Sequence, residues 1–149
     1  MAETIPIASD HAGFEMKERL ESRLRSMGYD VQDLGADSPA SSDYPDFAHP
    51  LAEMVSRGEA KRGVLLCGTG IGMAIAANRH PHVRAAVAWS PEVAELTRRH
   101  NDANVLVLPA RCISDEDGEK ILEVFLETAF EGGRHERRVE KLEPKEASA

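Results

Sequence analysis

Residues 63–72 read GVLLCGTGIG, and this stretch decides the fold because a short apolar run passes directly into a glycine-rich turn. Gly63–Cys67 is typical of a strand that is buried on both faces, as strands of parallel sheets are. The glycines at 68, 70 and 72 let the backbone approach a ligand and turn several N–H groups toward one point. Ile71–Arg79 then has the pattern of a helix. The stretch predicts a strand, an anion-binding turn and a helix in succession.

The same alternation of strand and helix continues on both sides of this stretch. Pro6 weakens the prediction of the first strand, Thr4–Ser9, because proline cannot donate a hydrogen bond to a neighbouring strand. The other strands are expected at Thr4–Ser9, Tyr29–Leu34, Arg84–Trp89 and Asn104–Leu108. Helices are expected at Gly13–Met27, Pro45–Gly58, Pro91–His100 and from Ser114 through Phe130. Five such alternations predict an α/β fold, a three-layer α/β/α sandwich around a Rossmann-like, five-stranded parallel sheet. We expect residues 1–149 to form a single domain in which 131–149 are a charged tail.

The composition is that of an acidic globular protein. The 149 residues carry 18 Lys and Arg against 26 Asp and Glu, a net charge of −8. This balance disfavours nucleic-acid binding, which needs a basic face, and no apolar run is long enough to span a membrane. The amino terminus lacks the regions of a signal peptide, and two cysteines are too few for a disulfide framework. We therefore expect a cytoplasmic protein with neither a nucleic-acid nor a membrane partner.

Cys67 and the turn that follows it are the first candidates for chemistry. The G-x-G-x-G spacing does not match a dinucleotide fingerprint, because Met73 stands where a third glycine is required. The turn is therefore a site for a phosphate or a reaction oxyanion, or else a tight turn without a ligand. Cys67 is a small buried hydrophobe or, since a helix start would favour its thiolate, a nucleophile or base.

Histidine and arginine residues mark further positions. Asp10 and His11 end the first strand, and Arg98–Asp102 follow the fourth helix. We expect both groups at the same rim of the sheet, where His11 and His100 would suit acid–base roles. The two histidines that flank Pro81 lack partners at metal-site spacing, so we interpret them as solvated and propose no metal. A solvated charge run and a fork for a phosphate are the two interpretations of Arg134, Arg137 and Arg138.

Taken together, these residues resemble the type B ribose-5-phosphate isomerase family, within the wider group that includes galactose-6-phosphate isomerase subunits. The resemblance spans residues 9–140 in matching order, and CGTGIG beside HNDANV is specific to the group. EGGRHERRV points to the pentose-phosphate branch. The matching stretches are SDHAGF (9–14), SDYPDFA (42–48), CGTGIGMAIAAN (67–78), RRHNDANV (98–105) and EGGRHERRVE (131–140).

The resemblance implies an aldose–ketose isomerase that interconverts D-ribose 5-phosphate and D-ribulose 5-phosphate without a metal or organic cofactor. Cys67 looks like the base that moves a proton between C2 and C1. A branch of the family uses a carboxylate at the position of Met73 instead, so this chain resembles the thiolate branch. The amides that would hold the cis-enediolate are those of Gly68, Thr69, Gly70, Ile71 and Gly72.

The resemblance also assigns roles to residues outside the turn. His100 resembles the proton donor that opens the furanose ring, assisted by Asp10. Thr69 and Asn101 would contact sugar hydroxyls. The positions that match phosphate- or substrate-contacting residues are His11, Arg111, Arg134 and Arg138.

In the family the active site lies between two subunits. The resemblance therefore implies a homodimer, or a dimer of dimers, with shared sites that bind a small sugar phosphate. The tail 131–149 would reach the neighbouring subunit. An isomerase of a six-carbon phosphosugar, such as allose or galactose 6-phosphate, is the nearest alternative. A non-catalytic phosphosugar-binding module is a second alternative, but binding alone would not need Cys67, His100 and Asp10 together.

Overall fold

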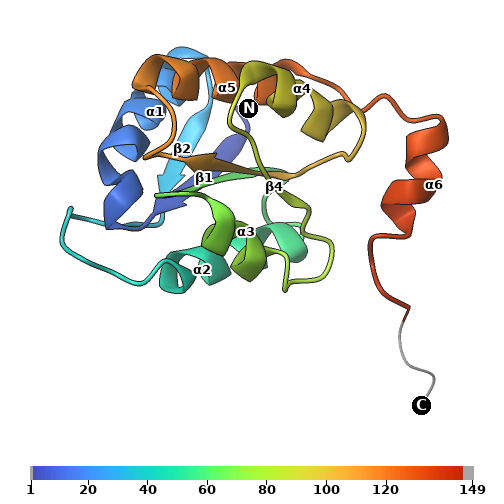
Figure 1. Ribbon diagram of the computed structural model, residues 1–149, viewed down its shortest axis with the longest axis horizontal. Coiled ribbons are helices and arrows are strands. Elements are labelled where there is room, and N and C mark those ends of the chain that lie inside the picture. Colours follow the sequence, from blue (N-terminus) through green and yellow to red (C-terminus); the bar gives the residue numbers. More distant parts are fainter. Residues whose placement is uncertain (1, 146–149) are drawn as a thin grey trace.

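The computed structural model describes residues 2–145, and its centre is a five-stranded parallel sheet between two layers of helices (Figure 1). This arrangement confirms the predicted fold class. The strands follow the order β2-β1-β3-β5-β4 across the sheet, so β3 is central. The strands are β1 (Thr4–Ser9), β2 (Asp30–Asp33), β3 (Gly63–Cys67), β4 (Ala85–Val87) and β5 (Val105–Pro109).

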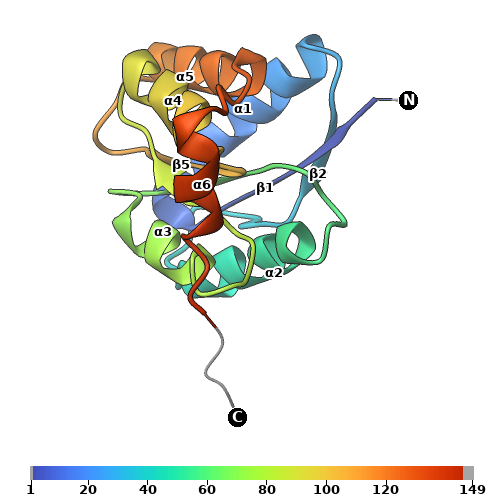
Figure 2. The same ribbon diagram turned by 90° about the vertical axis from the view of Figure 1, so that its right-hand side faces the viewer.

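Helices cover both faces of the sheet. One face carries α1 (Phe14–Ser26), α4 (Pro91–Arg99) and α5 (Asp115–Glu127) (Figure 1). The opposite face carries α2 (Pro45–Ser56) and α3 (Ile71–Ala77). A 3-10 helix, η1 (His11–Gly13), joins β1 to α1, and α6 (Arg134–Glu140) stands off one side of the layered body in Figure 1 and lies in front of it in Figure 2. Within residues 2–145, no helix combines the length and the apolar composition needed to cross a membrane.

The central strand β3 divides the hydrophobic core into two clusters, because its side chains alternate between the faces. Val64 and Leu66 pack in the cluster under α1, α4 and α5. Leu65 and Cys67 pack in the cluster under α2 and α3. All five residues of β3 are buried, as its apolar sequence predicts. The alternation places the sulfur of Cys67 on the α3 side of the sheet, next to the glycine-rich turn.

Pro6 lies in an internal strand without disrupting it. Odd-numbered residues of β1 exchange hydrogen bonds with β2, as in the bonds from Leu34 N to Ile7 O and from Ser9 N to Gly35 O. The nitrogen of Pro6 therefore faces β3, but the pairing of β1 with β3 begins only at Ile7. The missing N–H thus falls outside the ladder.

Most element boundaries lie within one or two residues of the sequence-based ones, and three differences have a structural cause or consequence. The strand expected at Arg84–Trp89 is reduced to β4, an edge strand that pairs with β5 alone. The last helix of the sandwich ends at Glu127 rather than at Phe130, because Thr128 is extended and its carbonyl accepts a hydrogen bond from Arg98 Nε at 3.1 Å. The charged tail contains a further helix, α6, whose His135 is buried. Residues 146–149 of that tail lie outside the described residues.

A group of charges joins α1 to the end of β2, with Lys17 and Glu21 buried and Asp33 exposed. Lys17 is fully buried, and its Nζ donates to Asp33 Oδ2 at 2.6 Å. Burial and a hydrogen bond with Asp33 raise the pKa of Glu21 to about 7. Burial alone would raise the pKa of Asp33, but hydrogen bonds with Glu21 and Lys17 lower it below its usual value. Below about pH 7 Glu21 is therefore protonated, and it acts as a hydrogen-bond donor toward the ionised Asp33.

We predict that stability falls as pH rises from about 4.5 to about 7, because the unfolded chain ionises Glu21 before the folded chain does. Glu21→Gln keeps a donor toward Asp33 but cannot ionise. It should gain about 1–2 kcal/mol over the wild type at pH 8, since a partly solvated carboxyl is screened. Urea denaturation at pH 5 and pH 8 measures this difference. Glu18→Gln, at an exposed neighbouring position, is the control, and an equal gain in both variants would contradict the assignment.

Candidate active site

A cavity of about 440 Å³ opens at the carboxyl ends of β1, β3 and β5, the edge at which ligands bind in parallel sheets. The three strands lead into Asp10, Cys67 and Arg111. The cavity is lined by Asp10, His11, Ala12, Tyr44, Cys67, Gly68, Thr69, Ile71, Gly72, Ile75 and Arg111. The structure thus brings together eight residues that the sequence singled out, from three separate β–α units.

The turn after β3 holds the sulfur of Cys67. Gly70 N donates to Cys67 Sγ at 3.2 Å, and this bond depends on the left-handed conformation of Gly70 (φ 78°). Ile71 N donates to Thr69 Oγ1 at 3.3 Å, so a second amide of the turn is also occupied. Among the described residues, the amides of Gly68, Thr69 and Gly72 have no partner within the chain. These three amides are the ones available to an oxyanion.

Asp10 and His11 are held in defined orientations at the end of β1. Asp10 Oδ1 accepts hydrogen bonds from Ala12 N at 3.0 Å and Gly13 N at 3.3 Å, which caps η1. Ser42 N donates to His11 Nδ1 at 3.2 Å, and His11 N donates to Ser42 Oγ at 3.1 Å. Since Nδ1 is an acceptor, the proton of a neutral His11 ring must lie on Nε2. His11 is therefore a fixed N–H donor beside the cavity.

Two further side chains shape the cavity. Arg111 lies against Gly68, where an added Cβ would meet its guanidinium at 3.3 Å. The Tyr44 ring lies on Gly72, where a Cβ would be 2.5 Å from the ring. Sequence reasoning gave no role to Ser42 or Tyr44, although both lie in the SDYPDFA stretch. Their roles depend on contacts with residues 31 and 28 positions away along the chain, which local patterns do not reveal.

Four predicted site residues lie elsewhere in the chain. We expected His100 at the same rim as Asp10, and this prediction is wrong for a single chain. β4 and β5 are parallel, so α4 must carry the chain back to the amino ends of the strands, where His100 follows it. Arg84 N, just before β4, accordingly donates to Asn104 Oδ1 at 2.7 Å. The four that lie away from Cys67 are His100, Asn101, Arg134 and Arg138; Gly70 does not line the cavity either, although it belongs to the turn and its amide bonds to Cys67 Sγ.

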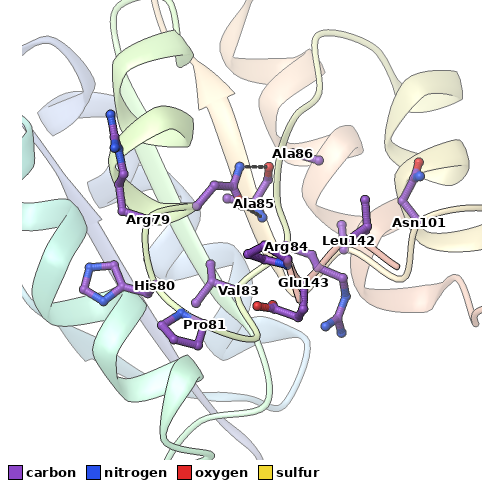
Figure 3. Close-up of a pocket in the computed structure, with 13 residues that line it drawn as sticks. Arg79, His80, Pro81, Val83, Arg84, Ala85, Ala86, Asn101, Leu142 and Glu143 are labelled. Carbon is purple, nitrogen blue, oxygen red and sulfur yellow. Dashed lines mark hydrogen bonds between the residues drawn. The ribbon is translucent and has the colours of Figure 1, made fainter. Parts of the chain in front are cut away.

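Asn101 instead lines a separate cavity of about 460 Å³ (Figure 3). Figure 3 shows its wall formed by the loop between α3 and β4, with Leu142 and Glu143 of the segment after α6. Glu143 Oε1 accepts a hydrogen bond from His82 N at 2.6 Å. His80 at its edge has a partner that the sequence did not suggest, because its Nε2 lies 2.7 Å from His49 Nδ1.

Among residues 2–145, two groups of side chains have donor atoms close enough for one metal ion, within 4.8 Å. In the first, His100, Glu131 and His135, the two rings are stacked with an interplanar angle of 14°, so their lone pairs lie in nearly parallel planes and do not converge. Arg99 also pairs with Glu131 at 3.1 Å. The second group is formed by Glu18, Glu21 and Asp33, where Lys17 already supplies the positive charge. Neither arrangement favours a metal ion.

The sequence and the structure both match known sugar-phosphate isomerases. The family model described as Ribose/Galactose Isomerase matches residues 5–142. The probable ribose-5-phosphate isomerase B of Mycoplasma genitalium is 43% identical over 144 residues, which are 95% of each chain. The ribose-5-phosphate isomerase B of Escherichia coli is 41% identical over 138 residues, 93% of each.

Solved structures agree with these relatives. A ribose 5-phosphate isomerase from Thermotoga maritima superposes with a TM-score of 0.92 at 49% identity, covering 95% of this chain and 98% of that one. Ribose-5-phosphate isomerase B from M. genitalium with bound ribulose-5-phosphate gives a TM-score of 0.91 at 42% identity, covering 95% of both. The fold and these matches define the protein as an aldose–ketose isomerase. The chain belongs to the ribose/galactose isomerase family.

We predict that Gly70→Ala loses isomerase activity as well as stability. A left-handed alanine costs about 1–2 kcal/mol, and its Cβ would lie 3.1 Å from Val87 Cγ1, so the turn must shift away from Cys67. Gly58→Ala is the matched control, because Gly58 has a φ of 77° with no atom within 4 Å of its Cβ position. It should lose stability alone. Thermal denaturation and isomerase assays separate the two effects, and equal activity in both variants would contradict the prediction.

Proposed function

We propose that the protein interconverts D-ribose 5-phosphate and D-ribulose 5-phosphate through a cis-enediolate, a step of the pentose phosphate pathway. The observation that carries this proposal is the Cys67 sulfur, held by Gly70 N in a cavity that also contains the His11 and Arg111 donors. The M. genitalium structure with bound ribulose-5-phosphate supports this choice of substrate. Isomerase assays on ribose 5-phosphate and allose 6-phosphate, side by side, test it. A higher kcat/KM for allose 6-phosphate would overturn the choice of substrate.

Cys67 acts as the base in this proposal. Its thiolate removes the proton from C2 of the open-chain aldose, and negative charge develops on O1 and, as the O2 hydroxyl proton passes to O1, on O2. The thiol then returns the carbon-bound proton to C1, which leaves the ketone at C2. The amides of Gly68, Thr69 and Gly72 are available to stabilise that charge. Met73, at the position where a branch of the family has a carboxylate base, is fully buried in the core and offers no alternative.

A second subunit completes the site in this proposal. His11 and Arg111 contact the substrate from the subunit that supplies Cys67. The neighbouring subunit contributes the set that one chain keeps away from its own Cys67, which is His100, Asn101, Arg134 and Arg138. Apolar side chains beside the cavity and just before α4 support a homodimer, since Ile71, Ile75 and Trp89 are each more than half exposed. The tail after residue 130 would reach across this interface.

We predict that Cys67→Ala lowers kcat for ribose 5-phosphate by about 10²–10⁴-fold, because the proton-transfer group is removed. The dissociation constant measured by calorimetry should change little, since the phosphate contacts remain. Cys112→Ala is the control, because Cys112 is exposed and outside the cavity lining, and it should retain activity. Turnover by the Cys67 variant close to that of the wild type would reject the thiolate as base.

We also predict that two inactive variants complement each other. In a dimer of one Cys67→Ala chain and one Arg134→Ala chain, a shared site forms once with both residues intact. Dimers purified through two different affinity tags should therefore recover activity that neither parent shows. Purified mixed dimers without activity would mean that Arg134 serves the Cys67 of its own chain or has no role.

A further inference from the structure

His135 is the buried residue of the short helix that carries Arg134 and Arg138. The other residues of α6 are exposed or partly exposed, and α6 stands off the layered body (Figures 1 and 2). The ring of His135 stacks on the ring of His100, with centroids 4.3 Å apart and an interplanar angle of 14°. Next to this stack, Glu131 N donates to Arg99 O at 3.1 Å. His135 therefore attaches α6 to the end of α4 through His100.

The nitrogens of His135 do not explain its burial. Its Nε2 is buried without a hydrogen-bond partner, and Glu131 Oε1 is 3.9 Å away. Burial, together with the neighbouring His100 and Arg134, lowers the pKa of His135 below its usual value, so the ring is neutral at pH 7. The contact that His135 does make is through the face of its ring.

We propose that His135 is a positioning residue: its stacked ring fixes the orientation of the His100 imidazole, and its buried side chain, by filling space, seats the helix that carries Arg134 and Arg138. This proposal rests on the proposed function, in which His100 donates the proton that opens the furanose ring. An acid that must reach the ring oxygen of a sugar loses rate when its plane rotates by a small angle. The same side chain thus links the ring-opening acid to the phosphate-binding arginines within one subunit.

Stacking requires a planar ring at position 135, hydrogen bonding requires a ring nitrogen, and filling of space requires neither, so substitutions can separate the three roles. His135→Phe keeps a planar ring and removes both nitrogens, whereas His135→Leu fills the site without a ring. If stacking positions His100, Phe should keep kcat for ribose 5-phosphate within about threefold of the wild type, and Leu should lower it roughly 10–100-fold. KM should change little in either variant, because both side chains are apolar and keep α6 seated.

The experiment compares the two variants on two substrates. D-erythrose 4-phosphate cannot close a furanose ring, because its O4 carries the phosphate, so its isomerisation needs no ring opening. The Leu variant should lose activity on ribose 5-phosphate and retain the activity that the wild type has on erythrose 4-phosphate. His100→Ala is the benchmark for this pattern, and thermal denaturation verifies that each variant is folded.

Several results would overturn the proposal. If both variants keep the wild-type kcat on ribose 5-phosphate, the ring is not what matters, and if the Phe variant is as slow as the Leu variant, the role belongs to a ring nitrogen. In the wild-type protein, nuclear Overhauser contacts between the ring protons of His100 and His135 are expected, and their absence would reject the stack without any variant. If His100→Ala affects both substrates equally, the proposed ring-opening role fails, while the Leu and Phe comparison still decides whether His135 positions His100.

Discussion

The burial of β3 on both of its faces is the constraint on which the rest of the structure depends. A strand without an exposed residue needs a helical layer on each side, and the layers here meet it with two separate hydrophobic clusters. Because side chains alternate along the strand, the same burial sends the last residue, Cys67, to the α3 face. The glycine-rich turn must start at this point, since the chain has to leave the sheet and enter α3.

The turn and the cavity are therefore consequences of the sheet. Gly70 adopts a conformation that places its N–H on the sulfur, and the ends of β1 and β5 bring Asp10 and Arg111 to the same edge. Ser42 and Tyr44 then contact residues at the ends of these strands, namely His11 after β1 and Gly72 after β3. One holds the tautomer of His11, and the other lies on Gly72. The cavity is thus lined by residues at the ends of the strands and by the loop before α2 that carries Tyr44.

The elements with strong local signals could be predicted from the sequence. Gly63–Cys67 matches β3 residue for residue. Ser90 caps α4 by accepting a hydrogen bond from Val93 N, and Ser114 caps α5 by accepting one from Asp117 N. The extent of β4 could not be predicted, because this edge strand pairs with β5 on one side only. The end of α5 could not be predicted either, because it depends on the hydrogen bond from Arg98 to Thr128. His100 was misplaced although the parallel sheet expected from the sequence already requires the helix before β5 to return to the amino ends of the strands. The fold followed from local patterns, whereas Ser42, Tyr44 and His135 depend on contacts between distant segments.

The separation of Cys67 and His100 has a consequence for how the protein behaves in solution. A strand rises about 3.3 Å per residue, so the length of β3 alone keeps the two side chains more than about 10 Å apart, and no rotation of either can close that gap. Any reaction that uses both groups needs two chains, which makes the rate per chain a function of protein concentration through the law of mass action.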